Sequence, residues 1–156
     1  VFQDELLPLC REAFPLSAKV SVTGHSMGGH GALTLFLKNP GAFASCSALS
    51  PICEPTAVPW GQKAFEAYLG SVDAGKAHDA CALMRAYTGP RVPILVDQGM
   101  ADEYVRSELR PEALEAACAE ADYPLVCRRH AGYDHSYLFV ATFMADHLEH
   151  HAKYLS

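Results

Sequence analysis

A GxSxG motif at residues 24–28 constrains the fold of this chain most strongly, because it lies between a strand pattern and a helix pattern. The run KVSVT at 19–23 is rich in β-branched residues and predicts a strand. From Met27 onward the residues follow a helical pattern. At such a junction the two glycines would remove side chains that collide where strand and helix approach closely. The setting therefore predicts a sharp turn that lifts Ser26 clear of a sheet.

The motif by itself leaves two roles open for Ser26. As a nucleophile, it would form an oxyanion in front of the backbone N–H of Met27, where the helix dipole favours negative charge. As a helix cap, it would only satisfy backbone donors, and the glycines would serve close packing. The strand-to-helix setting favours the nucleophile.

Strands and helices are expected to alternate along the whole chain. Further strands are predicted over 43–49, 93–97 and 125–129, and helices over 3–14, 30–37, 62–69, 77–87, 111–121 and 136–153. Alternation of this kind predicts βαβ units and a mostly parallel sheet flanked by helices. We expect one α/β domain over 1–156, in which 53–91 is an insertion between two strands.

A serine nucleophile needs a base that is held in place by an acid. In α/β hydrolases the chain order is serine, then Asp or Glu, then His, each in a loop that follows a strand. Asp102 follows the third predicted strand, and His135 lies in a loop led by glycine after the fourth. Asp97 ends the third strand, where a structural carboxylate is the better interpretation. Asp134 adjoins His135 in sequence, which generally directs its side chain elsewhere.

The other histidines fit the role of base less well. His25 and His30 flank Ser26 within the turn and its helix, from which reaching Ser26 Oγ is awkward. The rest lie in the insertion, at a strand end or on the final helix: His78, His130, His147, His150 and His151. His147 and His151 have the i,i+4 spacing of two metal ligands on one helix. The sequence offers no third ligand, so we interpret them as cationic side chains near a helix C-terminus, and we predict no metal site.

Two residues of the insertion could contact a substrate. Trp60 and Lys63 place an aromatic ring and a cation within PWGQK, which could line a pocket for an anionic molecule. A packed indole and a solvated lysine explain the same residues equally well.

Composition excludes several classes of partner. The formal net charge is −6, and Lys and Arg form no cluster, which argues against nucleic acid. No apolar run approaches the roughly 18 residues typical of a membrane span. The six cysteines are scattered without a CxxC pair, and we interpret them as buried apolar residues of a cytoplasmic protein. The chain starts at Val rather than Met, which suggests a partial polypeptide.

Several segments resemble the S-formylglutathione hydrolase family, also called esterase D. They are GHSMGGHGAL at 24–33, NPGAFASCSALSPICEP at 39–55, PWGQKAFEAYLG at 59–70, ILVDQG at 94–99 and GYDHSYLFVATFMADHLEHHAKYL at 132–155. The resemblance implies a cytosolic serine thioesterase of the α/β-hydrolase fold that cleaves S-formylglutathione to formate and glutathione. It implies Ser26 as nucleophile, Asp102 as acid and His135 as base. It also implies an enzyme without a cofactor, commonly a homodimer.

The chain departs from that family at its N-terminus. Family members are longer, and their additional N-terminal part supplies the first strands and a second oxyanion donor, so we expect the N-terminal strands of the fold to be missing here. Residues 1–156 alone are therefore expected to be inactive and poorly soluble. Two other functions remain open: a general carboxylesterase or acyltransferase of the same family, and a non-catalytic binding domain with the hydrolase fold.

Overall fold

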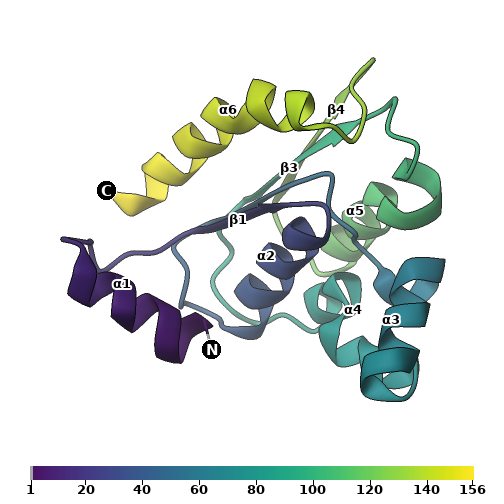
Figure 1. Ribbon diagram of the computed structural model, residues 1–156, viewed down its shortest axis with the longest axis horizontal. Helices are drawn as coiled ribbons and strands as arrows, with labels where there is room; N and C mark the ends of the chain where they lie inside the picture. The colour runs from purple at the N-terminus through teal and green to yellow at the C-terminus, as the bar shows by residue number, and fades with distance from the viewer. Residues whose placement is uncertain (1) are drawn as a thin grey trace.

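A parallel sheet with helices on both faces forms the framework (Figure 1). The computed structural model describes residues 2–156, with side chains from Asp4 onward. Within this range the sheet has the order β1-β2-β3-β4. Its strands are β1 (Val22–His25), β2 (Cys46–Leu49), β3 (Ile94–Gly99) and β4 (Leu125–His130). All neighbouring strands pair in parallel, which confirms the predicted sheet.

The first strand lies two to three residues later than the sequence predicts. Its pairing with β2 begins at Val22 opposite Cys46 and continues to His25 opposite Leu49. The first two residues of the GxSxG motif therefore belong to the strand, and the turn is confined to Ser26.

The helices are α1 (Leu7–Ala13), α2 (Met27–Lys38), α3 (Pro59–Leu69), α4 (Ala80–Arg85), α5 (Pro111–Glu120) and α6 (Tyr137–Leu155). Short helical turns occupy Phe2–Leu6, Pro55–Ala57, Asp73–His78 and Val105–Leu109. The helix predicted over 77–87 is divided at Asp79. Its side chain accepts a hydrogen bond from the Ala82 N–H at 3.0 Å, so that α4 begins there with a typical N-cap.

The predicted helix over 3–14 is present as a π-helical turn followed by α1, but none of the described apolar side chains in it is fully buried. Leu9 and Phe14 are 61% and 60% exposed, and α1 contributes no buried residue. Figure 1 shows α1 to one side of the sheet rather than on either of its faces. Amphipathic periodicity identified the helix, but it could not identify what the helix contacts.

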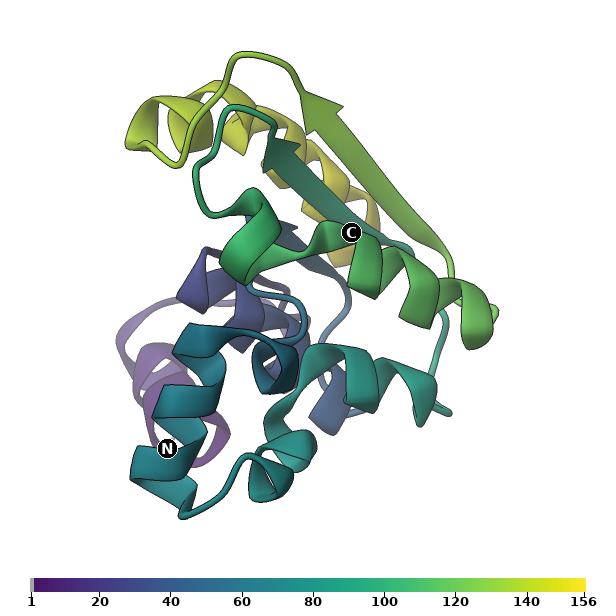
Figure 2. The same cartoon turned by 90° about the vertical axis from the view of Figure 1, so that its right-hand side faces the viewer.

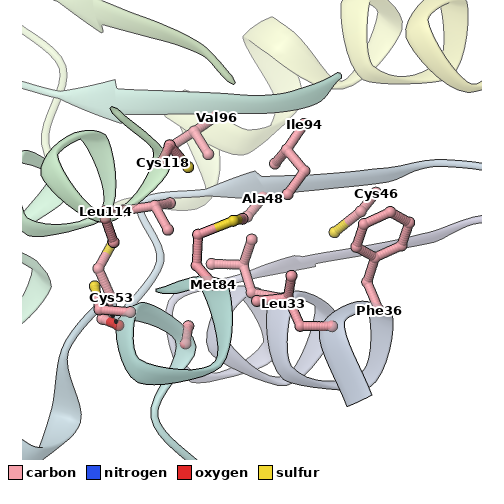
Figure 3. Close-up of a cluster of buried hydrophobic side chains, with 14 of the residues drawn as sticks. Leu33, Phe36, Cys46, Ala48, Cys53, Met84, Ile94, Val96, Leu114 and Cys118 are labelled. Carbon is pink, nitrogen blue, oxygen red and sulfur yellow. Dashed lines mark hydrogen bonds between the residues drawn. The ribbon is translucent and has the colours of Figure 1, made fainter. Parts of the chain in front are cut away.

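The apolar core lies between the sheet and helices α2, α4 and α5. Leu33 and Phe36 project from α2 toward Ala48 of β2 and Ile94 of β3, as Figure 3 shows. Of the six cysteines, Cys46, Cys53, Cys81 and Cys118 are buried, as predicted, whereas Cys10 and Cys127 are half-buried. Burial raises the pKa of Cys118 to about 12, which makes this thiol an apolar core residue rather than a nucleophile.

Helix α6 covers the opposite face of the sheet through a buried polar network. His147 and His151 are 0% and 5% exposed. His147 Nε2 lies 3.2 Å from Asp97 Oδ2, and its Nδ1 lies 2.8 Å from Ser47 Oγ. His151 lies 2.8 Å from both Ser47 Oγ and Ser45 Oγ. The network binds one helix to two strands.

The prediction that His147 and His151 are explained by the C-terminal end of a helix is therefore wrong, because both rings are buried against the sheet. Their i,i+4 spacing directs both rings at the sheet rather than at solvent. Burial lowers the pKa of His151 to about 4, so its imidazole is neutral at neutral pH. Within residues 2–156 no three His, Cys, Asp or Glu side chains are grouped closely enough to hold a metal ion.

The buried state of His151 predicts acid sensitivity. Its pKa in the folded chain is about 4, below the ordinary value of 6.5, so the unfolded chain binds more protons between these two values. The free energy of unfolding should therefore fall as the pH drops from 6.5 to 4, by on the order of 3 kcal/mol for this group. Urea denaturation at pH 7 and pH 4.5 measures the difference. His151→Gln should shrink the difference. An equal pH dependence in the parent and the variant would contradict this account.

Strand β1 forms an open edge of the sheet. The N–H groups of Val22 and Ser26 donate to Ser45 and Leu49 of the neighbouring segment, at 3.1 and 2.9 Å. In a parallel ladder the intervening Thr23 therefore directs its own N–H away from β2. A largely apolar groove of about 370 Å³ adjoins this edge, and it is lined by residues of β1, α6 and the segment after α1.

We predict that residues 1–156 expressed alone associate through this edge, because unpaired strand edges template pairing with other strands. Size-exclusion chromatography at several concentrations should show oligomers or aggregates. Thr23→Pro should reduce the association, since it removes an outward N–H and retains the backbone hydrogen bonds to β2, although the side-chain bond from Ser47 Oγ to Thr23 Oγ1 is lost. A monodisperse monomer at high concentration would contradict the prediction.

Candidate active site

Ser26 has a strained backbone at the junction of β1 and α2. Its φ and ψ are 57° and −118°, a region that residues with side chains rarely adopt and that costs on the order of 1–3 kcal/mol. Hydrogen bonds on both sides hold it there. Its N–H donates to Leu49 O at 2.9 Å, and its carbonyl accepts the His30 N–H at 3.0 Å. The side chain is thereby directed away from the sheet at the first turn of a helix.

Only one of the two motif glycines is required by close contact. A Cβ at Gly24 would lie 2.2 Å from Gly28 O, so strand and helix cannot approach this closely with any other residue. A Cβ at Gly28 would meet nothing within 4 Å among the described residues, so the predicted collision there is wrong. The chain turns at Ser26, and it is Gly29 that faces Gly24 and Pro51, at 3.2 and 3.0 Å from its ideal Cβ.

Hydrogen bonds join Ser26, His135 and Asp102 in a line. His135 Nε2 lies 2.8 Å from Ser26 Oγ, and His135 Nδ1 lies 2.5 Å from Asp102 Oδ2. The three residues are 109 and 33 positions apart in sequence. This order of atoms allows the imidazole to take a proton from the hydroxyl while the carboxylate fixes its tautomer.

Two loops at the same sheet edge carry the acid and the imidazole (Figure 2). The segments that follow β3 and β4 lie side by side there, as parallel pairing requires. Met100 N–H donates to His130 O, and Ala101 N–H donates to Tyr133 O, both at 2.9 Å. A Cβ at Gly99 would lie 2.5 Å from Tyr133 O, so the glycine permits this contact. The two loops therefore behave as one unit.

The Asp102 carboxylate is fully buried and receives several donors. Its side chain is 0% exposed. The Tyr104 N–H donates to Oδ1 at 2.9 Å, and Gln98 Nε2 lies 3.4 Å from Oδ2, which also faces His135. A buried carboxylate with these donors has one fixed orientation.

Two rings flank the imidazole of His135. The His25 ring lies 4.6 Å from it between centroids, and the Tyr104 ring meets it edge-on at 5.3 Å. Burial, followed by repulsion from His135, lowers the pKa of His25, so this second imidazole remains neutral beside the first. The packing restricts rotation of the His135 ring.

Of the two predicted substrate contacts, only Trp60 is linked to this cluster. Its ring stacks on Tyr104 at 5.8 Å, and 54% of the residue is exposed. Lys63 lies on the same helix, α3, with an exposed side chain, and within residues 2–156 no hydrogen bond or ion pair connects it to the cluster. An open pocket of about 370 Å³ lies beside His135, between the Asp102 and His135 loops.

Asp97 has a separate environment on the α6 face of the sheet. Arg128 donates to both of its carboxylate oxygens, and His130 Nε2 lies 3.1 Å from Oδ1. Burial would raise the pKa of Asp97, but the hydrogen bonds from His147, Arg128 and His130 outweigh it and hold the pKa well below its usual range. Asp97 therefore ties β3 to β4 and α6, and it does not contact the imidazole of His135.

The N-terminus of α2 faces the Ser26 hydroxyl. Met27 is the first helical residue, so its backbone N–H has no acceptor one turn earlier. With the positive end of the helix dipole, this donor suits an anion that forms on a substrate held at Ser26.

Sequence reasoning missed Tyr104, Gln98 and the contact of His25 with His135. Tyr104 follows Asp102 by two residues, the spacing at which a backbone N–H commonly bonds an aspartate side chain. The sequence around Gln98 did not indicate a role for it, because a polar residue within a strand pattern does not reveal which loop its side chain faces.

The chain is similar to known proteins in both sequence and structure. Residues 1–150 match the profile of the Esterase family, described as "Putative esterase". The chain belongs to this esterase family. The S-formylglutathione hydrolase of Rattus norvegicus is 51% identical over 156 residues, which are 98% of this chain and 55% of the rat protein. This esterase chain therefore spans about half the length of the curated relatives it matches.

Solved structures place the esterase chain in the α/β-hydrolase fold. The S-formylglutathione hydrolase from Agrobacterium tumefaciens is 43% identical, with a TM-score of 0.92 over 98% of this chain and 56% of that one. One from Staphylococcus aureus is 22% identical, with a TM-score of 0.72 over 93% of this chain and 60% of that one, and shows the fold alone. Among the helices of residues 2–156, none combines the length and the apolarity that crossing a membrane requires.

The two buried aspartates should respond differently to mutation. In the natural polypeptide that contains this chain, Asp102→Asn should lower kcat by about 10⁴, because the amide no longer fixes the tautomer of His135. Asp97→Asn should mainly lower the free energy of unfolding, because it leaves Arg128 without its buried partner. Hydrolysis of an aryl acetate per folded molecule, together with urea denaturation, separates the effects. Equal losses of kcat in equally folded variants would contradict the assignment.

Proposed function

We propose that the natural polypeptide containing this chain is a serine thioesterase that hydrolyses S-formylglutathione to formate and glutathione. The hydrogen-bonded line from Ser26 through His135 to Asp102 carries the proposal. The curated relatives and the similar structure from Agrobacterium tumefaciens bear the name S-formylglutathione hydrolase, which supports the choice of substrate.

Ser26, His135 and Asp102 act in the first half of the reaction as nucleophile, base and acid. His135 Nε2 accepts the hydroxyl proton while Ser26 Oγ forms a bond to the formyl carbon. Asp102 stabilises the resulting imidazolium, and the Met27 N–H donates to the oxyanion. The C–S bond then breaks, and glutathione leaves as a thiolate that takes the proton from His135.

Water completes the cycle through the same groups. His135 accepts a proton from water as the water oxygen attacks the formyl carbon of the Ser26 ester. Collapse of the second oxyanion returns that proton to Ser26 Oγ and releases formic acid, which loses its remaining proton to solvent and becomes formate. The proposed mechanism includes no cofactor, because Ser26 supplies the nucleophile and His135 transfers the proton in both halves of the reaction.

The peptide part of the substrate is expected to lie across the open side of the site. Trp60 provides an exposed aromatic face. Its ring stacks on Tyr104, and the Tyr104 ring in turn contacts His135. Lys63 is exposed one turn later on α3 and offers a cation for a carboxylate of glutathione. We also propose a cytoplasmic location, with which the six unpaired cysteines are compatible, and a homodimer, as the resemblance implies.

The nucleophile assignment is tested by Ser26→Ala in the natural polypeptide. The variant should lose hydrolysis of S-formylglutathione by on the order of 10⁴–10⁶ in kcat while remaining folded, because no other group can form the ester. A fluorophosphonate probe should label the parent and not the variant. Retention of more than about a tenth of the parent kcat would overturn the assignment.

A comparison of kcat/KM for two substrates distinguishes the thioesterase from the other functions. The proposal predicts a larger kcat/KM for S-formylglutathione than for an aryl acetate. The reverse order would favour a general carboxylesterase. No turnover and no labelling would favour a non-catalytic binding domain.

A further inference from the structure

Gln98 places a fully buried carboxamide directly behind the Asp102 carboxylate. It lies on β3 next to Asp97, so the two side chains point to opposite faces of the sheet. Asp97 meets α6, whereas Gln98 faces Asp102 and Ser50, and its exposure is 0%. It has no access to substrate.

The orientation of this amide is determined by what surrounds its nitrogen. Gln98 Nε2 lies 2.9 Å from Gly99 O, 3.2 Å from Ser50 Oγ and 3.4 Å from Asp102 Oδ2. Rotating the amide by half a turn would set its oxygen against a carbonyl and a carboxylate, both acceptors. The NH₂ group must therefore face Asp102.

The same orientation leaves the other end of the amide without a partner. Gln98 Oε1 is buried and makes no hydrogen bond with any described residue. A buried carbonyl in this state costs free energy that an apolar side chain of the same shape would avoid. Gln98 is thus a poor choice for packing, and its value lies in the donors that it offers.

We propose that Gln98 is a positioning residue for the proposed hydrolysis: its NH₂ group holds the Asp102 carboxylate in the orientation that aligns His135 with Ser26. Asp102 Oδ2 then lies between two donors, the Gln98 amide and the His135 ring. The Tyr104 N–H fixes the second oxygen. Ser50, buried at φ 40°, places its hydroxyl where it fixes the Gln98 amide in turn.

The experiment uses Gln98→Met in the natural polypeptide, because Met keeps the length of the side chain and removes both donors. We expect kcat for an aryl acetate to fall roughly tenfold, the scale of one hydrogen bond to a charged group, with KM within twofold. Labelling by a fluorophosphonate should slow by a similar factor. The melting temperature should stay the same or rise, since the unpartnered carbonyl is gone.

Two comparisons separate positioning from a structural role. In the Asp102→Asn background, Gln98→Met should have no further effect on kcat, because the carboxylate that it orients is absent. Ser47→Ala removes a buried hydroxyl from the α6 network, so it should lower the melting temperature and leave kcat per folded molecule unchanged. If Gln98→Met does not fold, Ser50→Ala takes its place, and it should lower kcat by a smaller factor than the one expected for Gln98→Met.

The proposal is overturned by a kcat within twofold of the parent in the folded variant. It would also be overturned if Gln98→Met lowered kcat by the same factor in the Asp102→Asn background as in the parent. If Gln98→Met does not fold and Ser50→Ala is used in its place, an unchanged kcat in Ser50→Ala would overturn it. The inference rests on the proposed function only through the roles of Ser26, His135 and Asp102. Because aryl acetate and fluorophosphonate report those roles directly, a failure of S-formylglutathione as substrate would be seen separately and would leave this test intact.

Discussion

Parallel pairing at the carboxyl edge of the sheet is the interaction on which the site depends. The pairing continues past the strands, residue by residue, into the loops. Ser26 N–H donates to Leu49 O, Ser50 N–H to Asp97 O, and Met100 N–H to His130 O, at 2.9, 2.8 and 2.9 Å. Each bond fixes the first residue after one strand against a residue at or near the carboxyl end of the next strand. The sheet therefore fixes where the backbone segments that carry Ser26, Asp102 and His135 begin, and support by strands holds a site more precisely than support by free loops.

Strand β3 connects this edge to both layers of helices. On one face, Asp97 binds Arg128 of β4 and His147 of α6, so the strand that leads to Asp102 and the strand that leads to His135 share one buried carboxylate. On the other face, Gln98 lies behind Asp102. Buried polar groups are costly unless they are paired, so their concentration at one end of one strand indicates where a unique arrangement matters most.

The backbone at the site also adopts an unfavourable conformation. Ser26 has a positive φ, and the close approach at Gly24 leaves no room for a side chain. Such strain persists only where the surrounding hydrogen bonds outweigh it, and here the Leu49 and His30 bonds do so. The result is a hydroxyl presented at the N-terminus of α2, where backbone donors and the helix dipole both favour a developing negative charge.

The sequence by itself determined the order of strands and helices, the turn at Ser26, and the loops that hold Asp102 and His135, because periodicity and glycine placement are local properties of the chain. It left the choice between Asp97 and Asp102 to loop placement, and only the structure showed which of them contacts His135. It misjudged His147, His151 and Gly28 for one reason: spacing gives the direction of a side chain on its own element, but not what lies opposite. The contacts of Gln98 with Ser50, and of Tyr104 and His25 with His135, join segments that are distant in sequence, so only the tertiary structure could decide them.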